Sequence, residues 1–365
     1  MPNVLLEEFS PLCNIQAFVE EDENSVHFYL WDYPGQEHAS IRSCWVRNYG
    51  AAPGEINAAA MEEGHAPMLP ADFCAHPEGA ERLDPQRLSL VWFEEGDAAA
   101  LLYEGEILSV IPGWAGQSGE ERFPGYARDC TEVSDLCLPL GTPDSNVLHE
   151  RVKAALEFWQ SWEDNPWPRL QEQFIQRIES CAAPVDTYYA IDGGNWPPKA
   201  LVKTKARDGI VYVFTIGASI APQPKVELYS ETPEQLRRFE LAFAIEEEWL
   251  SRNEMKLLQY ISAQTNLPWS HMTFLAEGHT IPCEEISSID SAFDYVLMTR
   301  PADAPQMDYP NLTNERVNVL WLVPITAAER RHAEEFSSED LMKRAGSAKL
   351  WIFDGTPKFM PVSKD

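Results

Sequence analysis

The most constraining feature of this sequence is a nearly continuous apolar run that meets a proline and continues as a charged segment. The run is VNVLWLV at 317–323, followed by Pro324 and the residues ITAAERRHAEEF. Strands that are apolar at almost every position are covered on both faces, so we expect a central strand here. Pro324 cannot donate to a ladder and ends the strand, while Thr326 and Glu329 have the spacing of a helix-capping box. The junction predicts a sheet with helices packed against it.

The second half of the chain alternates further strand and helix signals. A well-formed helix start occurs in TPEQLRRFELAFAIEEEWLS at 232–251, where Thr232 is a candidate N-cap and Pro233 occupies the first helical position. Runs rich in β-branched and aromatic residues predict strands at 199–205, 209–217, 225–231, 293–299 and 349–355.

The first half of the chain is predicted to form short strands separated by turns. Residues 25–35 and 40–50 each end in a Tyr followed by turn residues, and 88–113 has the pattern of a three-stranded meander. Two helices are expected within 146–180, broken by the residues NPWP.

The length of 365 residues favours two domains. The fold class expected is α+β, with two domains of mixed β-sheets flanked by helices. The boundaries predicted from the patterns are an acidic N-terminal α+β domain at 1–145, a helical connector at 146–182 and a second domain at 183–365.

Charge is the most informative bulk property. The chain has 58 acidic and 28 basic residues, a net charge of -30, and its first 182 residues hold 32 of the acidic but only 10 of the basic ones. Such a field repels nucleic acid and anionic membranes and accelerates association with a basic partner. The alternative is that the acid serves solubility alone. The concentration of charge in one half favours a partner surface.

Other classes of function find little support in the residues. No apolar run approaches the ~20 residues of a membrane span, and the acidic start does not resemble a secretory signal, so a cytoplasmic location is expected. The seven cysteines form no C-x-x-C pair and the eight histidines have no zinc-site spacing. We therefore expect neither a metal nor another cofactor.

No catalytic set is recognisable. His279, within Gly-His-Thr, has no partnered carboxylate or cysteine at a known spacing, so a structural role is favoured over a catalytic one. The pairs Glu94-Glu95 and Glu120-Glu121 do not form a dyad by spacing, because adjacent residues in a strand point to opposite faces.

Aromatic residues within the acidic half give a better candidate, because tryptophans rimmed by acid suit a basic protein partner. The alternative for each tryptophan is a place in the core. The residues predicted to bind the partner are Trp31, Trp45, Trp92, Glu94, Glu95, Trp114, Glu120 and Glu121.

Several ordered segments of the second half resemble the suppressor of fused domain family, of the bacterial type. They are VFTIGAS and KVELYSE at 213–219 and 225–231, the stretch ending in EGHTIP at 249–282, VLMTRP at 296–301, and LVPIT before an acidic helix. The resemblance spans about residues 185–355 and implies that the domain at 183–365 has a suppressor-of-fused-like fold. The first 180 residues show no comparable match.

The resemblance implies a non-catalytic protein-binding function. In animals, such proteins sequester zinc-finger transcription factors of hedgehog signalling; in bacteria, the domain is associated with immunity proteins that neutralise toxins. The compact chain favours the bacterial type, with a basic protein, such as a toxin domain, as the partner. Two alternatives stay open: a small-molecule binder or hydrolase that uses a cleft between the halves, and an acidic mimic of nucleic acid.

Overall fold

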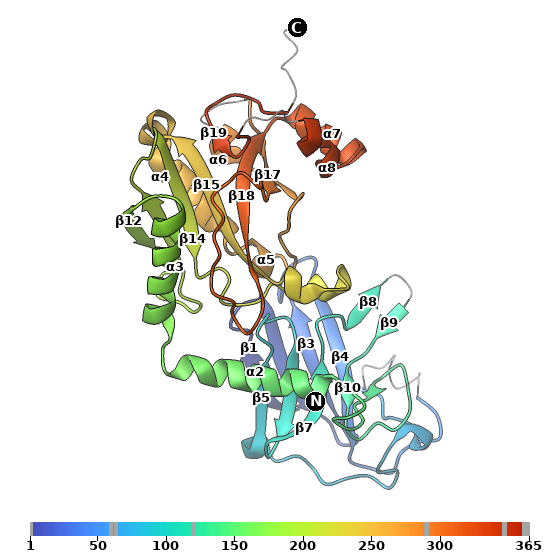
Figure 1. The fold of residues 1–365 in the computed structure, drawn as a ribbon. Coiled ribbons are helices and arrows are strands. Elements are labelled where there is room, and N and C mark those ends of the chain that lie inside the picture. Colours follow the sequence, from blue (N-terminus) through green and yellow to red (C-terminus); the bar gives the residue numbers. More distant parts are fainter. Residues whose placement is uncertain are drawn as a thin grey trace. The chain divides into compact units, whose positions relative to one another are not determined.

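The structure of the chain is a computed structural model, and it describes residues 3–57, 61, 65–118, 121–287, 292–344 and 349–359. The chain folds into two compact units, shown in Figure 1. Unit 1 comprises Met1–Asp164 with Trp269–Met272, and unit 2 comprises Asn165–Pro268 with Thr273–Asp365. Both units combine helices with β-sheets, so the α+β class expected from the sequence is confirmed.

Unit 1 contains three sheets. A four-stranded antiparallel sheet has the order β1-β2-β3-β4, a five-stranded sheet has the order β11-β10-β7-β6-β5, and β8 pairs with β9. The predicted meander is present as β5, β6 and β7. The strands are β1 (Asn3–Phe9), β2 (Ile15–Glu21), β3 (Ser25–Asp32), β4 (Ser40–Asn48), β5 (Leu88–Trp92), β6 (Ala99–Tyr103), β7 (Glu106–Ile111), β8 (Gly116–Ser118), β9 (Glu121–Phe123), β10 (Tyr126–Ala127) and β11 (Leu138–Pro139).

The two helices predicted within 146–180 are present, and each packs in a different unit. Helix α2 (Leu148–Glu163) buries Leu148 and Val152 in a cluster with the apolar side chains of β6 and β7. Helix α3 (Trp167–Cys181) buries Phe174 and Ile178 against the sheet of unit 2. Pro166, directly before α3, separates the two helices.

Among the described residues, unit 2 is built on one eight-stranded sheet: seven strands follow the order β12-β13-β14-β15-β18-β17-β16, and β19 is the eighth, paired with β15. Its β15–β18 and β15–β19 pairs are parallel and its other pairs antiparallel, so the sheet is mixed. The strands are β12 (Val185–Ala190), β13 (Ala200–Thr204), β14 (Ile210–Ile216), β15 (Arg238–Glu246), β16 (Thr280–Pro282), β17 (Tyr295–Thr299), β18 (Val317–Ile325) and β19 (Ile352–Phe353). The helices are α3, α4 (Glu247–Gln264), α6 (Glu284–Ser287), α7 (Ala327–Glu335) and α8 (Ser338–Arg344), and the first two residues of α5 (Leu267–Ser270) also belong to this unit.

Both faces of this sheet are covered, as the apolar runs predict. Helix α3 lies beside β12 and β14 (Figure 1), and its apolar side chains join a cluster that contains Ala242 and Ala244 of β15. Alternate residues of β15, such as Phe243, point to the opposite face, and α4 also packs against β13, β14 and β15. Strand β18 is therefore central and buried over nearly its whole length.

The prediction of a helix at 232–251 is wrong for residues 232–246 and holds only from 247 onward. Pro233–Gln235 forms only a 3₁₀ turn, Arg238–Glu246 is strand β15, and the helix begins at Glu247. Phe239 and Phe243 match helical spacing, but alternation fits as well, and pairing with β14 and β18 selects the strand.

The strand predicted at 225–231 is also absent. Val226–Leu228 is a 3₁₀ turn that follows Lys225, whose φ of +63° is left-handed. The apolar and aromatic residues of this segment favoured a strand, but the segment pairs with no strand among the described residues.

A buried carboxylate joins β15 to the turn after β14. Glu240 is fully buried and accepts hydrogen bonds from the hydroxyl groups of Thr215 and Ser219, both at 2.6 Å, and from the N–H groups of Gly217 and Ser219. Burial raises its pKa, and these hydrogen bonds act in the opposite direction. The motif TIGAS at 215–219 is thus hydrogen-bonded to Glu240 of β15, a segment whose sequence had predicted a helix.

Candidate partner-binding groove

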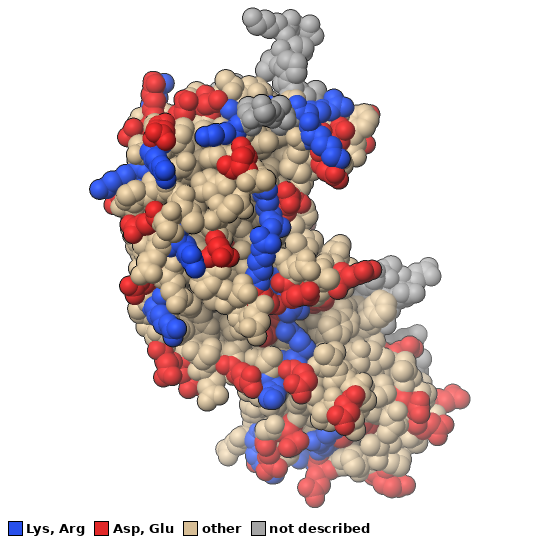
Figure 2. Space-filling model, viewed as in Figure 1, with Lys and Arg blue, Asp and Glu red and all other residues tan. Residues whose placement is uncertain are grey.

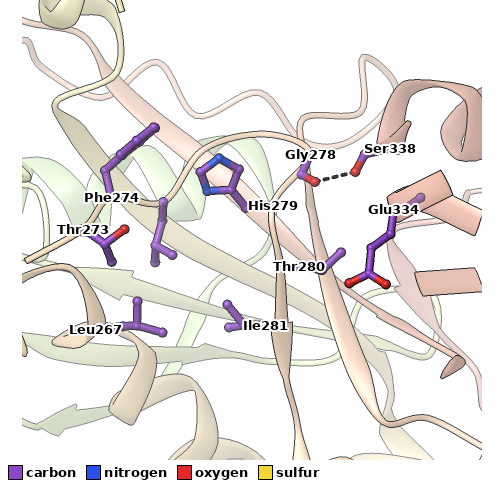
Figure 3. Close-up of a pocket in the computed structure, with 11 residues that line it drawn as sticks. Leu267, Thr273, Phe274, Gly278, His279, Thr280, Ile281, Glu334 and Ser338 are labelled. Atoms are coloured by element: carbon purple, nitrogen blue, oxygen red, sulfur yellow. Dashed lines mark hydrogen bonds between the residues drawn. The ribbon is translucent and has the colours of Figure 1, made fainter. Parts of the chain in front are cut away.

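A pocket of about 440 Å³ opens in unit 2 beside the sheet edge formed by β16. We call it the edge groove. In Figure 3, Phe274 and His279 lie on one side of it, Glu334 and Ser338 on the other, and Leu267 and Ile281 below. The lining residues are Leu267, Thr273, Phe274, Leu275, Gly278, His279, Thr280, Ile281, Ala333, Glu334 and Ser338. Apolar and polar side chains contribute about equally to this lining, and such a combination can both bury a ligand and orient it.

The loop that precedes β16 is positioned by one buried glutamine. Gln223, in the turn after β14, accepts a 2.7 Å hydrogen bond from the N–H of Leu275 and donates one of 3.0 Å to its carbonyl oxygen. The Gln223 amide also donates to the carbonyl oxygen of Leu236. A loop far along the chain is thereby fixed against the core, so this wall of the edge groove is preformed.

The opposite wall comes from helices α7 and α8. Thr326 and Glu329 form the predicted capping box that starts α7, with both reciprocal hydrogen bonds present. Ser338, at the start of α8, donates its hydroxyl hydrogen bond to the carbonyl oxygen of Gly278, the dashed line in Figure 3. Gly278 has a φ of +90°, which glycine adopts without strain, and its N–H binds the Met298 carbonyl.

Strand β16 presents an open backbone edge to the edge groove. The His279 carbonyl accepts from Met298, and Cys283 N–H donates to Asp294, so the odd-numbered residues face β17. In an antiparallel pair, the backbone groups of alternate residues point away from the partner strand. The N–H and C=O of Thr280, which lies between His279 and Ile281, are therefore directed outward. Within the described part of the chain, β17 is the only strand that pairs with β16. Tyr260 covers the far end by donating to the carbonyl of Pro282.

Exposed aromatic rings flank the edge groove. Tyr229 is 73% exposed, and its ring lies 5.5 Å from that of Phe274, which in turn lies 5.1 Å from the His279 ring. Phe336, at the end of α7, is 61% exposed and stacks on His332 at 4.6 Å. Large exposed aromatics next to a pocket are typical of anchors for a protein partner.

The imidazole of His279 contacts an aromatic ring in this site. Burial lowers the pKa of His279, so its neutral form predominates at neutral pH. The neighbouring Ser338 hydroxyl is engaged with Gly278, and Glu334 pairs with Arg330 at 2.6 Å. The arrangement suits recognition of a ligand by shape and hydrogen bonding better than it suits nucleophilic chemistry.

Four of the residues predicted to bind a partner are buried in unit 1. Trp45 is fully buried, and its indole N–H donates to Asn48 at 2.8 Å. Trp92 is also buried and donates to Glu8. Neither ring is accessible to a partner in this fold, because the apolar indole gains more from the core than from water.

The carboxylates Glu94 and Glu95 are buried as well, in the turn after β5. Both contact the Arg151 guanidinium, at 3.4 Å and 2.7 Å respectively. The expectation that they point to opposite faces is wrong, since it assumed a strand at a position where the chain turns. The single guanidinium offsets one of the two negative charges, and burial keeps both carboxylates away from a partner.

Of the remaining predicted residues, two are partly exposed to solvent and two lie wholly or partly outside the described residues. Trp31 is half-buried on β3, and Trp114 is 37% exposed, so a partner-binding role for these two stays a prediction. Glu120 lies outside the described residues, as does the side chain of Glu121.

The described residues contain no group of three or more His, Cys, Asp or Glu side chains placed to hold a metal ion. All seven cysteines are free thiols in this structure, and six of them are buried. A helix long and apolar enough to cross a bilayer is likewise absent from the described residues.

The fold and the edge groove together define unit 2 as a mixed-sheet domain with a preformed pocket. The model of the family described as suppressor of fused protein (SUFU) matches residues 195–356, which lie within the span of unit 2 and include every residue of the edge groove. This segment is therefore suppressor-of-fused-like, as the ordered motifs predict. Comparison with curated proteins gave no match.

Two solved structures are similar to parts of the chain. One is a suppressor of fused homologue from Neisseria gonorrhoeae FA 1090, with 15% identity and a TM-score of 0.35, covering 53% of this chain and 97% of its own. The other is described as the Sufu-Fu complex, with 15% identity and a TM-score of 0.35, covering 49% of this chain and 84% of its own.

The sequence did contain a signal that Tyr229 and Phe336 are exposed, but local patterns did not indicate that they flank a pocket. Tyr229 stands in ELYSET and Phe336 in AEEFSSED, segments in which polar and charged residues outnumber the apolar ones that could form a core. The edge groove itself combines residues around 223, 275 and 335, and no local pattern brings them together.

Proposed function

We propose that unit 2 is a non-catalytic binding domain that holds an extended segment of a protein partner in the edge groove. The observation that carries this proposal is the outward-facing N–H and C=O of Thr280 beside a preformed pocket. An extended peptide can add to such an edge through backbone hydrogen bonds, while pockets select its side chains. The apolar lining accepts one of these side chains, and Tyr229 and Phe336 contact the segment on either side.

The edge is short, which determines how the segment gains affinity. β16 has three residues, and Pro282 provides no N–H, so Thr280 offers the two backbone hydrogen bonds of this edge. Each contributes only about 0.5–1.5 kcal/mol net. Most of the affinity therefore comes from side chains that enter the pocket and contact the flanking aromatics.

We further propose that the partner is a basic protein, with a toxin domain as the candidate and this chain as its immunity-type inhibitor. The support is the net charge of -30 together with the resemblance to bacterial members of the family. Acidic side chains are spread widely over unit 1 in Figure 2. A field of this sign accelerates the encounter with a basic partner and weakens at high salt.

The test uses the full chain and a displayed library of unstructured peptides. We expect selected peptides to lose about 10-fold or more in affinity on Thr280→Pro, because proline removes the outward N–H and its ring obstructs the edge. Thr280→Val is the matched control, since it keeps the N–H and the β-branched shape. Tyr229→Ala is a second variant whose exposed position leaves folding intact. Equal binding by all these forms would exclude the edge groove.

The charge of the partner is tested separately. Basic sequences should be enriched among the selected peptides, and their affinity should fall as salt is raised. Enrichment of neutral or acidic peptides that still depend on Thr280 would retain the groove and reject the basic partner.

A further inference from the structure

A second, more polar pocket of about 240 Å³ lies where β18 begins and β17 ends. Arg300 follows β17 and Arg316 precedes β18, and both line this pocket with Glu277 and Gln306. Trp321 and Met307, which are almost fully buried, provide apolar lining. The pocket thus combines two guanidinium groups with two apolar side chains, and it shares no lining residue with the edge groove.

The two guanidinium groups lack the ion pairs that nearby arginines form. Within the described chain, no carboxylate oxygen lies within 4 Å of the side-chain nitrogens of Arg300 or Arg316. Glu315, directly before Arg316, instead pairs with Arg237 at 3.6 Å and Arg238 at 2.6 Å on the neighbouring strand. In a chain with 58 acidic residues, two such arginines in one pocket are conspicuous.

The rim of the pocket is ordered by hydrogen bonds that leave these groups available. Gln306 donates its amide to the carbonyl oxygens of Pro301 and Ala304, which fixes the segment after Arg300. Glu277, the acidic residue of the lining, accepts from the backbone N–H of Arg300 at 3.3 Å. Its charge opposes one of the two positive charges, so the pocket retains a net positive character and binding is expected to be weak.

We propose that this pocket binds a small oxyanion, the phosphate or carboxylate group of a small molecule. Guanidinium groups present paired N–H donors that match both oxyanions in a bidentate geometry. Arg316 is exposed and Arg300 is half-buried, so water competes for these donors, which is a further reason to expect weak binding. Lys and Arg side chains gather in a line on the face of unit 2 shown in Figure 2, which raises the local concentration of anions.

Isothermal titration of the full chain with inorganic phosphate and with succinate, at constant ionic strength, tests the proposal. We expect at least one of them to bind, and Arg300→Gln and Arg316→Gln each to weaken it about 10-fold, the loss of one charged hydrogen-bonding group. Binding of phosphate alone, or of succinate alone, identifies the oxyanion that the pocket selects.

Arg177→Gln is the matched control, because Arg177 is an exposed arginine on α3 that does not line the pocket. Arg316→Lys keeps the charge but loses the planar fork, so an intermediate affinity is expected. Thermal melting without anion verifies that each variant folds. The proposal is overturned if neither anion binds the wild-type chain, or if Arg177→Gln weakens binding as much as the pocket variants.

Discussion

Replacing Glu329 by alanine should destabilise unit 2 far more than a surface substitution in a helix would. Glu329 is fully buried at the start of α7. One carboxylate oxygen accepts from the N–H of Thr326 at 2.7 Å, and the other accepts from the N–H of Phe359 at 3.0 Å. The side chain therefore holds both the helix start and the segment after β19.

The magnitude follows from the two donors that lose their acceptor. A buried donor left without a partner costs about 1–3 kcal/mol, so two of them give about 2–6 kcal/mol for Glu329→Ala. Thr326→Ala removes the other half of the capping box and should cost about 0.5–2 kcal/mol. Thr326→Ser keeps the hydroxyl acceptor and should cost less than the alanine variant.

Urea denaturation followed by tryptophan fluorescence measures these free energies of unfolding, and the order of the three variants is the informative result. The reasoning requires Glu329→Ala to be the least stable and Thr326→Ser the most stable. A Glu329→Ala protein within about 0.5 kcal/mol of wild type, the range of ordinary surface changes, would refute it. Since α7 carries part of the edge-groove wall, the same variant should also weaken peptide binding.

Two further predictions concern Gly217, directly after β14, and Lys199, directly before β13. Gly217→Ala should cost about 2–5 kcal/mol in urea denaturation, because Gly217 has a φ of +95° and a Cβ there would lie 2.1 Å from the carbonyl oxygen of Pro198; a change under about 1 kcal/mol would contradict the close approach. Burial lowers the pKa of Lys199 to about 8, so between pH 8 and the ordinary lysine pKa the unfolded chain binds more protons than the folded one. The free energy of unfolding should therefore rise with pH across this window, and Lys199→Met should remove the rise. An unchanged pH profile in the variant would contradict this prediction.

Local patterns predicted those elements whose cause is local. The capping box of Thr326 and Glu329 depends on residues three apart, and the buried run at 317–323 is apolar at almost every position. Both are therefore present, but the prediction that Pro324 ends the strand is wrong, because β18 continues through Pro324 to Ile325, paired with β17. The meander at 88–113 likewise depends on turns that the sequence marks with glycine.

Non-local partners decided the elements that were mispredicted. Residues 238–246 satisfy both helical and strand spacing, and the choice falls to β18, which lies about eighty positions later in the chain. In the sequence, the carboxylate Glu240 also disfavours the prediction of a central strand, because a buried carboxylate needs hydrogen-bond donors. Its donors, at 215–219, are known only from the structure. The edge groove combines three separated segments for the same reason, so motif resemblance located its region but not its walls.

The parallel pairing of β15 with β18 and β19 bears on how the chain is made. Ala244 pairs with Ile352, more than one hundred residues away, and Leu241 pairs with Leu320. The antiparallel strands β12 to β15 can pair while synthesis continues. The edge of β15 that faces away from β14 has no partner until β18 and β19 have been synthesised. Pairings of such sequence separation slow folding and prolong the exposure of apolar strands. During translation, β15 is therefore the segment of unit 2 for which we expect the greatest dependence on chaperones.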